Sequence, residues 1–373
     1  MIARKSGAYG YFPGGLSLNP DLVHPSYGKS MADLLQLLRS QEADPEQPPA
    51  LVPIIPFGLP SRPGRCDPHR PLIMGILNVT PDSFSDGEIG RVRRTAEAEE
   101  EEDIDEKVWL EHVLGLARQL IANGADILDI GGMSTRPGVS DASVTVEEEL
   151  SRVVPVIQAI RVEGIDIPIS VDTFRPEVAE AAVAAGANCI NDVRGGREAG
   201  MLETMSRLEV PVVLMHSRGN SISMTSDQAK DYTSTGGVVN GVITELSETI
   251  RQAEQAGIKR WNTILDPGIG FAKTLKGNLE LLRSLEKLFG DPPTAIDSAP
   301  KEVVLDSYNV LVGASRKGFV GTVTSRSSPQ DREYGNAAIT ARCTDSGIVS
   351  IVRVHEPGPT KDVIMMTRAI KMG

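Results

Sequence analysis

MGILNVTPDSFSDG, the stretch from Met74 to Gly87, begins as an apolar strand and turns abruptly polar. Its apolar part extends back to Leu72, and its polar part starts at Asn78. An apolar run of this kind is typical of a strand buried on both faces, as in a parallel sheet. Ligands of α/β proteins bind at the carboxyl ends of such strands. The stretch therefore predicts both the first strand of a core and the first part of an active site.

The same construction recurs along the chain, because apolar runs that end in polar residues alternate with helical patterns. Predicted strands span residues 72–79, 126–132, 167–172, 189–193, 210–216, 263–267, 310–314 and 349–355. Predicted helices span residues 106–123, 146–162, 175–185, 198–207, 237–255, 274–289, 333–345 and 361–371. Glycines at 124, 164, 186 and 257 follow predicted helices, and Pro176 lies in a first helical turn, as expected of helix ends.

Eight βα units in about 300 residues are the count of a (β/α)8 TIM barrel. A doubly wound open sheet is the alternative, but it normally has fewer strands and a GxGxxG phosphate loop, which this chain lacks. Residues 1–70 differ, since they are rich in proline and in breakers such as PGG and PSRPG, with one short helical pattern at 30–39. The sequence predicts an irregular N-terminal extension or linker over 1–70 and a TIM barrel over 71–373.

Composition and net charge bear on the class of protein and on the kind of partner that it binds. Of 373 residues, 40% are hydrophobic and 24% are charged, which is ordinary for a globular protein. The net charge of −12 argues against nucleic acid as a partner. Much of the excess comes from the run EAEEEEDIDE at 97–106, which is interpreted as a solvated insertion.

The three cysteines, at 66, 189 and 343, are odd in number and scattered, which favours a reducing compartment over a disulfide framework or a zinc site. No apolar run approaches 18 residues, and the N-terminus lacks the order of a signal peptide. We expect a soluble, intracellular protein of the cytoplasm or mitochondrion, with no membrane partner.

All eight predicted strands end in polar or charged residues. A single carboxylate or amide at a strand end is more often a loop cap than a ligand contact, so the convergence of eight is what predicts a site. The strand-end residues are Asn78; Asp129 with the loop GGMSTRPG at 131–138; Asp172; Asn191; Met215 and His216; Asp266, Phe271 and Lys273; Ser315, Arg316 and Lys317; Arg353 and His355.

The residue types suggest a ligand with a heterocyclic part and an anionic part. Asp172, Asn191 and Asp266 are short, rigid groups suited to the edge of a planar, nitrogen-rich ring that carries an amine. Met215 and Phe271 are suited to packing against the face of that ring.

The anionic part, such as a phosphate, would be matched by the cationic side chains at the same mouth. These are Arg136, Arg316, Lys317, Arg353 and His355. Asn78 offers a hard oxygen suited to Mg²⁺ that is held mainly by water and phosphate. No Ser-His-Asp set, reactive cysteine or histidine cluster is evident, which favours catalysis by positioning and electrostatics.

Eight motifs, in order, resemble those of the dihydropteroate synthase family. They are MGILNVTPDSFSDG, ADILDIGGMSTRPG, SVDT, INDVRGG, VVLMHSRG, LDPGIGF, GASRKGFVG and VRVHEP. The resemblance covers residues 71–373, and the first motif and GASRK are highly specific. It implies a TIM barrel, usually a homodimer, that joins 4-aminobenzoate to 6-hydroxymethyl-7,8-dihydropterin diphosphate. The products it implies are 7,8-dihydropteroate and diphosphate.

The resemblance also assigns roles to residues. It implies that Asn78, Lys317, Arg353 and His355 are catalytic, with Asn78 as the Mg²⁺ ligand. Pterin binding is implied for Asp172, Asn191, Met215, Asp266, Phe271, Lys317 and Arg353. Diphosphate binding is implied for Asn78, Thr135, Arg353 and His355. Aminobenzoate binding is implied for Thr135, Arg136, Pro137, Phe271, Ser315 and Lys317.

The chain departs from the bacterial pattern in three places. Met133 stands where bacterial members usually have Glu, and insertions lengthen the chain at 91–106 and 290–306. The insertions suggest a eukaryotic form. Residues 18–38, with NPD and HP, resemble the end of the hydroxymethyldihydropterin pyrophosphokinase domain that precedes the synthase in fungi. We therefore expect a fragment of a multifunctional folate enzyme.

Two alternatives stay open. A pterin-binding methyltransferase that serves a corrinoid shares the strand-end Asp and Asn pattern, but the STRP and SRK segments at 134–137 and 315–317 favour the synthase. A non-catalytic pterin-binding module would be expected to have lost charged strand ends, and none is lost. For the synthase, departure of diphosphate from an electron-rich ring predicts a dissociative, SN1-like displacement assisted by Mg²⁺.

Overall fold

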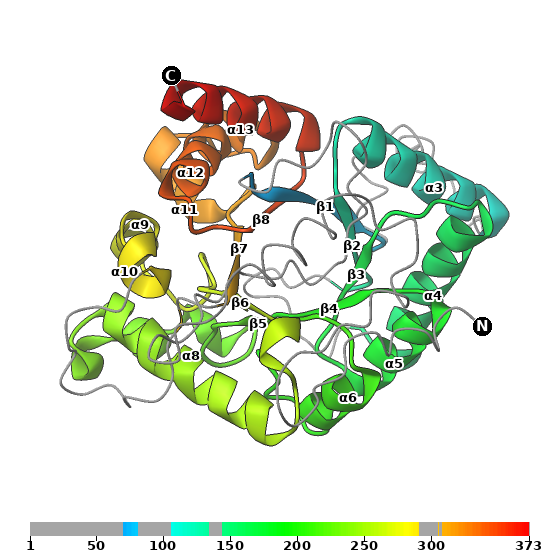
Figure 1. The fold of residues 1–373 in the computed structure, drawn as a ribbon, viewed down its shortest axis with the longest axis horizontal. Helices are drawn as coiled ribbons and strands as arrows, with labels where there is room; N and C mark the ends of the chain where they lie inside the picture. Colours follow the sequence, from blue (N-terminus) through cyan, green and yellow to red (C-terminus); the bar gives the residue numbers. More distant parts are fainter. Residues whose placement is uncertain (1–69, 81–105, 134–143, 291–304, 306–307, 373) are drawn as a thin grey trace, which may run out of the picture. The chain divides into compact units, whose positions relative to one another are not determined.

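A computed structural model describes residues 70–80, 106–133, 144–290, 305 and 308–372, and these residues form a closed barrel of eight parallel strands in chain order (Figure 1). The strands are β1 (Leu72–Asn78), β2 (Ile127–Gly131), β3 (Ile169–Asp172), β4 (Cys189–Asp192), β5 (Val212–Met215), β6 (Thr263–Asp266), β7 (Asn309–Gly313) and β8 (Ile351–Val354). The predicted TIM barrel is confirmed, and the open sheet is excluded.

Closure depends on β1, which pairs with both β2 and β8. Met74 aligns with Ile127 of β2 and with Arg353 of β8. Because all strands are parallel, their carboxyl ends meet at one rim of the barrel. The strands are almost entirely buried, since one face lines the barrel interior and the other contacts the helices.

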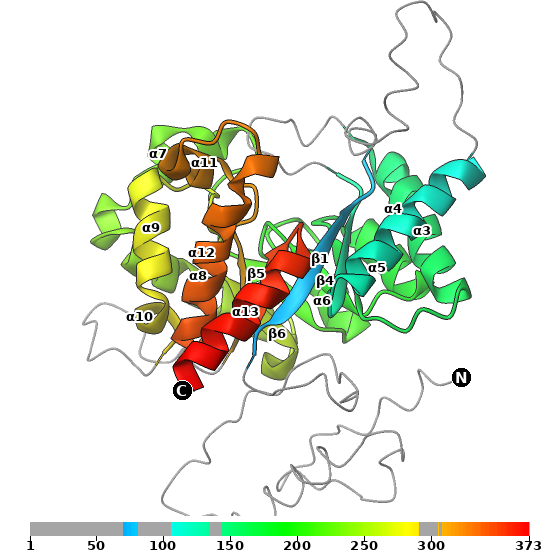
Figure 2. The same ribbon diagram turned by 90° about the horizontal axis from the view of Figure 1, so that it is seen from above.

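Helices surround the barrel and alternate with its strands (Figure 1). The main ones are α3 (Glu106–Ala122), α4 (Val146–Val162), α5 (Pro176–Ala185), α6 (Met201–Leu208), α8 (Val238–Gln255), α9 (Leu275–Arg283), α10 (Leu285–Phe289), α11 (Gly318–Thr324), α12 (Glu333–Ser346) and α13 (Pro357–Met372). Helices α3 and α13 both pack against β1 (Figure 2). None of the described helices is both long enough and apolar enough to span a bilayer.

Helix ends follow the sequence signals. Thr145 and Glu148 form a capping box at the start of α4, in which each side chain accepts a hydrogen bond from the other residue's backbone N–H. Pro176 is the first residue of α5, and Gly186 ends that helix in the left-handed conformation, with φ of 118°. These predicted boundaries are confirmed.

The predicted helices differ from the observed ones in several places. The single helix predicted at 274–289 is two helices, because Ser284 leaves the helical conformation between α9 and α10. Helix α6 begins at Met201 instead of 198. Helix α13 begins at Pro357 instead of 361, since proline is tolerated in a first helical turn. Helix α11 was not predicted, because its sequence GFVGTVT has low helix propensity, and it is held by buried Val320 and Gly321.

Several predictions lie outside the described residues. These are the N-terminal extension with its helix at 30–39, the acidic run up to 105, and most of the insertion at 290–306. They remain predictions.

Candidate active site

The structure brings the described strand-end residues to the carboxyl rim of the barrel. Asn78, Asp172, Met215 and Asp266 are the last residues of β1, β3, β5 and β6, and Asn191 is the third residue of β4. The residues contributed by loops or by the last strand are Phe271 after β6, Ser315 and Lys317 after β7, Arg353 within β8 and His355 after it. Thr135, Arg136 and Pro137 lie outside the described residues.

Arg353 links one side of the rim. Its Nε donates to Asp129 Oδ2 at 2.6 Å, and its Nη2 donates to Asp172 Oδ2 at 2.5 Å. Asn191 Nδ2 donates to the same Asp129 oxygen at 3.1 Å. One largely buried polar network therefore joins the middle of β2 to the carboxyl ends of β3, β4 and β8.

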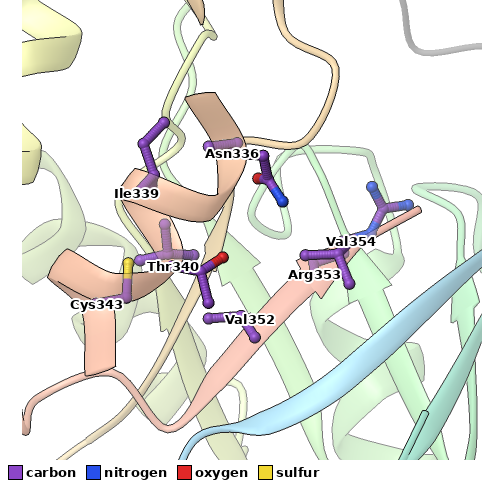
Figure 3. Close-up of a pocket in the computed structure, with 9 residues that line it drawn as sticks. Asn336, Ile339, Thr340, Cys343, Val352, Arg353 and Val354 are labelled. Carbon is purple, nitrogen blue, oxygen red and sulfur yellow. The ribbon is translucent and has the colours of Figure 1, made fainter. Parts of the chain in front are cut away.

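Figure 3 shows Arg353 beside a small cavity between β8 and α12. Thr340 and Cys343 of α12 line this cavity, and the Arg353 guanidinium lies away from these two residues, toward the end of β8 (Figure 3). Arg353 thus lines this cavity while its guanidinium binds Asp129 and Asp172 of the polar network.

Burial shapes the charges of this network. It raises the pKa of Asp172 to about 7, against the opposing charge of Arg353. The charges of Asp129 and Asp172 hold the pKa of Arg353 above its ordinary value, although burial opposes them. Among the described residues, Asp129 Oδ1 and Asp172 Oδ1 are buried acceptors with no donor. Because buried acceptors without a partner are costly, these oxygens are suited to the N–H groups of a ligand.

The other side of the rim is built around Lys317. Its Nζ donates to the carbonyl oxygen of Ile269 and lies 4.6 Å from the centre of the Phe271 ring. Burial lowers the pKa of Lys317 to about 8, against the charge of Asp266. Asp266, itself buried, accepts a hydrogen bond from the Gly268 amide at 2.6 Å, and burial raises its pKa. A carboxylate, an ammonium and an aromatic ring thus lie together.

His355 and Arg316 make pairs of their own at the last two strand ends. His355 Nδ1 lies 2.9 Å from the Ser315 hydroxyl oxygen, which brings together two residues predicted for different substrates. Arg316 donates to Glu356 Oε1 at 2.6 Å, so its positive charge is partly balanced within the protein. Of these two neighbouring cations, Lys317 therefore lies at the site, whereas Arg316 is paired with Glu356 beside it.

Some residues of this region received no role from the sequence. Asp129 is the partner shared by Arg353 and Asn191, and its signal is a carboxylate in the middle of the apolar strand ILDIG. Asp192, next to Asn191, instead accepts hydrogen bonds from the amides of Arg194 and Gly196, at 2.7 Å each, and so shapes its own loop. The sequence Asn191-Asp192 by itself does not show which of the two residues faces the site and which shapes the loop.

Residues 74–355 match the family model described as pterin binding enzyme. The chain therefore belongs to the pterin binding enzymes, a family whose ligand class agrees with the buried acceptors at the rim. It is 40% identical over 305 residues to dihydropteroate synthase of Clostridium beijerinckii, a match that covers 82% of this chain and 93% of that protein. Within the family, the chain is of the dihydropteroate synthase type, as its motifs predict.

A longer relative is the folic acid synthesis protein fol1 of Schizosaccharomyces pombe. It is 40% identical over 359 residues, which cover 95% of this chain. The chain spans only 42% of the length of that relative. The resemblance to a fungal multifunctional protein is thereby confirmed.

Solved structures of the family share the fold. Dihydropteroate synthase of Xanthomonas albilineans with 4-aminobenzoic acid has a TM-score of 0.65 and 38% identity, covering 82% of this chain and 94% of that one. The Yersinia pestis enzyme in a sulfonamide drug complex has a TM-score of 0.67 and 33% identity, covering 83% of this chain and 97% of that one.

Proposed function

We propose that this chain joins 4-aminobenzoate to 6-hydroxymethyl-7,8-dihydropterin diphosphate, giving 7,8-dihydropteroate and diphosphate in folate biosynthesis. The observation that carries the proposal is the pair of buried carboxylates, Asp172 and Asp266, set on separate strands and each beside a cation. Structures of the Xanthomonas albilineans relative hold 4-aminobenzoic acid in one case and 7,8-dihydropteroate in another. Those ligands support the same substrates here.

The pterin would lie between the two halves of the rim. Asp172 and Asp266 would accept from its ring N–H and amino groups, Asn191 would complete its edge, and Met215 and Phe271 would pack beside it. Lys317 lies between the pterin and aminobenzoate positions in this arrangement. Arg353 would cover the pterin face and reach toward the diphosphate.

The chain's own residues would act by orientation and by charge. Cleavage of the bond to diphosphate leaves positive charge on the pterin methylene and ring, which Asp172 and Asp266 stabilise. Arg353 and His355 stabilise the departing anion. The aromatic amine of 4-aminobenzoate is already nucleophilic and needs mainly to be held in position, a task we assign to Phe271, Ser315, Lys317 and the loop residues Thr135, Arg136 and Pro137.

Mg²⁺ fits the site as an ion bound mainly by substrate and water. Asn78 ends β1 at the rim with its side chain exposed, so its amide oxygen is available as a single hard ligand. The described residues hold no group of three His, Cys, Asp or Glu side chains that would bind a metal on their own. When bound, Mg²⁺ would neutralise charge on the leaving diphosphate.

The decisive experiment measures diphosphate release before the steady state, with and without 4-aminobenzoate. Arg353→Lys keeps the charge but loses the planar fork that holds Asp129 and Asp172, so we expect release to slow about 100-fold. Lys317→Met should weaken pterin binding as well as turnover. Arg342→Lys is the matched control, because Arg342 of α12 pairs with Glu286 far from the rim.

Each outcome has a distinct meaning. Release at the parent rate in both rim variants would remove the anion site from this rim. Pterin binding without any turnover by the parent chain would favour a binding module. Methyl transfer to a corrinoid in place of dihydropteroate formation would favour the methyltransferase alternative.

We also propose that the chain forms a homodimer through α11, α12 and α13. These helices lie together (Figure 1), and α12 packs against both of the others. They expose large apolar side chains, namely Val323, Tyr334, Met365, Met366, Ile370 and Met372.

Met366→Lys with Ile370→Lys should shift the sedimentation coefficient to that of a monomer. Val162→Lys, at the last and exposed residue of α4, is the control and should leave the sedimentation coefficient unchanged. A monomeric parent would contradict the proposal.

The homology to fol1 supports the proposal that this chain is part of a multifunctional folate protein. In that protein, residues 71–373 would be the synthase. Other activities of such a protein would lie outside this barrel. The compartment, cytoplasm or mitochondrion, remains the expectation given by the sequence.

A further inference from the structure

A second polar network lies behind the rim, next to the loop that follows β6. Lys273, His216 and Glu245 form its core, and Arg218 completes it. Lys273 Nζ lies 3.1 Å from His216 Nδ1, and His216 Nε2 lies 3.1 Å from Glu245 Oε2. Arg218 Nε donates to both Glu245 carboxylate oxygens at 3.0 Å. We call these four residues the Lys273 network.

Burial lowers the pKa of Lys273 to about 7, and the hydrogen bonds around its charged form define one arrangement of protons in this network. A charged Lys273 has three N–H donors, and three acceptors surround it: Gly268 O and Phe271 O, both at 2.9 Å, and His216 Nδ1. His216 must then carry its proton on Nε2 and donate it to Glu245. Burial lowers the pKa of His216 to about 4, which agrees with a neutral ring.

Side chains hold most of the carbonyl groups of residues 268–272, here called the β6 loop. Lys273 binds those of Gly268 and Phe271, and the Tyr232 hydroxyl donates to Ala272 O at 3.2 Å. The carbonyl of Ile269, between them, accepts from Lys317 Nζ. Lys273 and Lys317 therefore hold adjacent carbonyls of one short loop, one from behind and one from the rim.

The β6 loop needs such support, because its backbone is strained. Ala272 has φ of 48°, in the left-handed region that a residue with a Cβ rarely adopts. Gly268 has φ of 66°, and a Cβ there would lie 1.8 Å from His216 O. Strained conformations persist only where the surroundings over-determine them. Here the surroundings include Tyr232, which holds the carbonyl of Ala272, and the Lys273 network, which holds the carbonyls of Gly268 and Phe271.

We infer that Lys273 is a positioning residue for Lys317, acting through the β6 loop and supported by His216, Glu245 and Arg218. Lys273 touches no substrate in this arrangement. It holds the carbonyls of Gly268 and Phe271, which flank Ile269 in the loop, and the carbonyl of Ile269 accepts from the ammonium of Lys317. The inference rests on the proposed function, in which Lys317 contacts the pterin. It assigns a role to a buried charge that the proposed chemistry does not use.

A double-mutant cycle tests this inference. Calorimetric affinity for the dihydropterin diphosphate is measured in the parent, Lys273→Met, Lys317→Met and the double variant. Lys273→Met should weaken binding about 10-fold when Lys317 is present, as expected for loss of a charged hydrogen-bond donor. It should weaken binding no more than about 3-fold when Lys317 is absent, because coupled residues are not additive. Equal weakening in both backgrounds would overturn the inference.

Two further variants guard against misfolding and against a general loss of stability. If Lys273→Met does not fold, Glu245→Gln takes its place in the cycle. This change leaves Lys273 in place and removes only the carboxylate charge of the network. We again expect the loss of pterin affinity to depend on the presence of Lys317. Ile160→Val, on the buried face of α4, controls for a general loss of stability and should keep the parent affinity. A parent that binds no pterin would overturn the proposed function itself, and this inference with it.

Discussion

The pKa values of the charged residues at the rim depend on burial more than on neighbours in the sequence. Asp172 and Lys317 lie on different strand ends, yet burial moves both pKa values toward neutrality, to about 7 and about 8. Groups of this kind cluster at functional sites, because a ligand or a partner is needed to offset the cost of their burial.

Asp172 and Asp266, which we propose to bind the edge of the pterin, should be essential for pterin affinity. We expect Asp172→Ala and Asp266→Ala each to weaken pterin affinity by about 1 to 3 kcal/mol, because ring N–H groups would be left without a buried acceptor. Calorimetric titration of the folded variants measures this loss. Asp345→Ala, on the exposed side of α12, is the control. Parent affinity in both rim variants would place the pterin elsewhere.

His216 should contribute to acid sensitivity. Burial lowers its folded pKa to about 4, below its ordinary value, so the unfolded chain binds more protons between pH 6.5 and 4. Stability from this group is therefore complete above pH 6.5 and falls on acidification, by about 2 kcal/mol at pH 5. Asp172 and Asp192, whose pKa values are raised by burial to about 7 and about 6, act in the opposite direction.

Comparison with a variant isolates this contribution. Urea unfolding of parent and His216→Gln at pH 7 and pH 5 should show a smaller loss on acidification in the variant. An identical pH dependence would mean that the pKa of His216 is the same in the folded and the unfolded protein.

At the scale of elements, the β6 loop depends on glycines that its neighbours leave no room to replace. Gly270 has φ of 87°, and a Cβ there would lie 2.8 Å from Lys317 Cδ. Position 270 therefore favours glycine for its backbone conformation, and a side chain there would push Lys317 aside.

We expect Gly270→Ala to displace Lys317 and to strain the loop. Strain at a left-handed residue should cost about 1 to 3 kcal/mol of stability, and pterin affinity should fall with it. Thermal unfolding and calorimetry measure the two effects. Gly318→Ala is the matched control, because a Cβ at the first position of α11 would meet no atom within 4 Å. Equal behaviour of the two variants would separate Gly270 from the site.

At the scale of the whole molecule, the barrel is complete from Leu72 onward. All eight strands and the pairing of β1 with β8 lie within the described residues after Arg70. Arg70 is anchored there by a bidentate ion pair with Asp126, with N–O distances of 2.8 and 2.7 Å.

Deletion of residues 1–65 should therefore leave a folded and active barrel that keeps Arg70. Far-UV circular dichroism with a cooperative thermal transition would verify folding, and dihydropteroate formation would verify activity. A matched truncation of residues 1–71 removes Arg70 and should melt at a lower temperature. If the shorter deletion itself loses its cooperative transition, the N-terminal segment is part of the barrel's stability.

The fold and most of the rim were predictable, because both depend on local patterns. Strands such as LIMGILN are apolar along their whole length, and each polar strand end follows directly in sequence. Boundaries failed where tertiary packing overrides propensity: Gly- and Val-rich α11 is helical, and Ser284 interrupts a pattern that continues through it.

The sequence by itself determined the eightfold alternation, the family and the residues that end each strand. Only the tertiary structure decided which of these residues pair. Arg353 meets Asp129, which is 224 positions away, and Lys273 meets His216, which is 57 positions away. Asn191 turns to the site, whereas adjacent Asp192 binds its own loop. Pairing of this kind depends on barrel closure, which sets distances and burial that no local pattern contains.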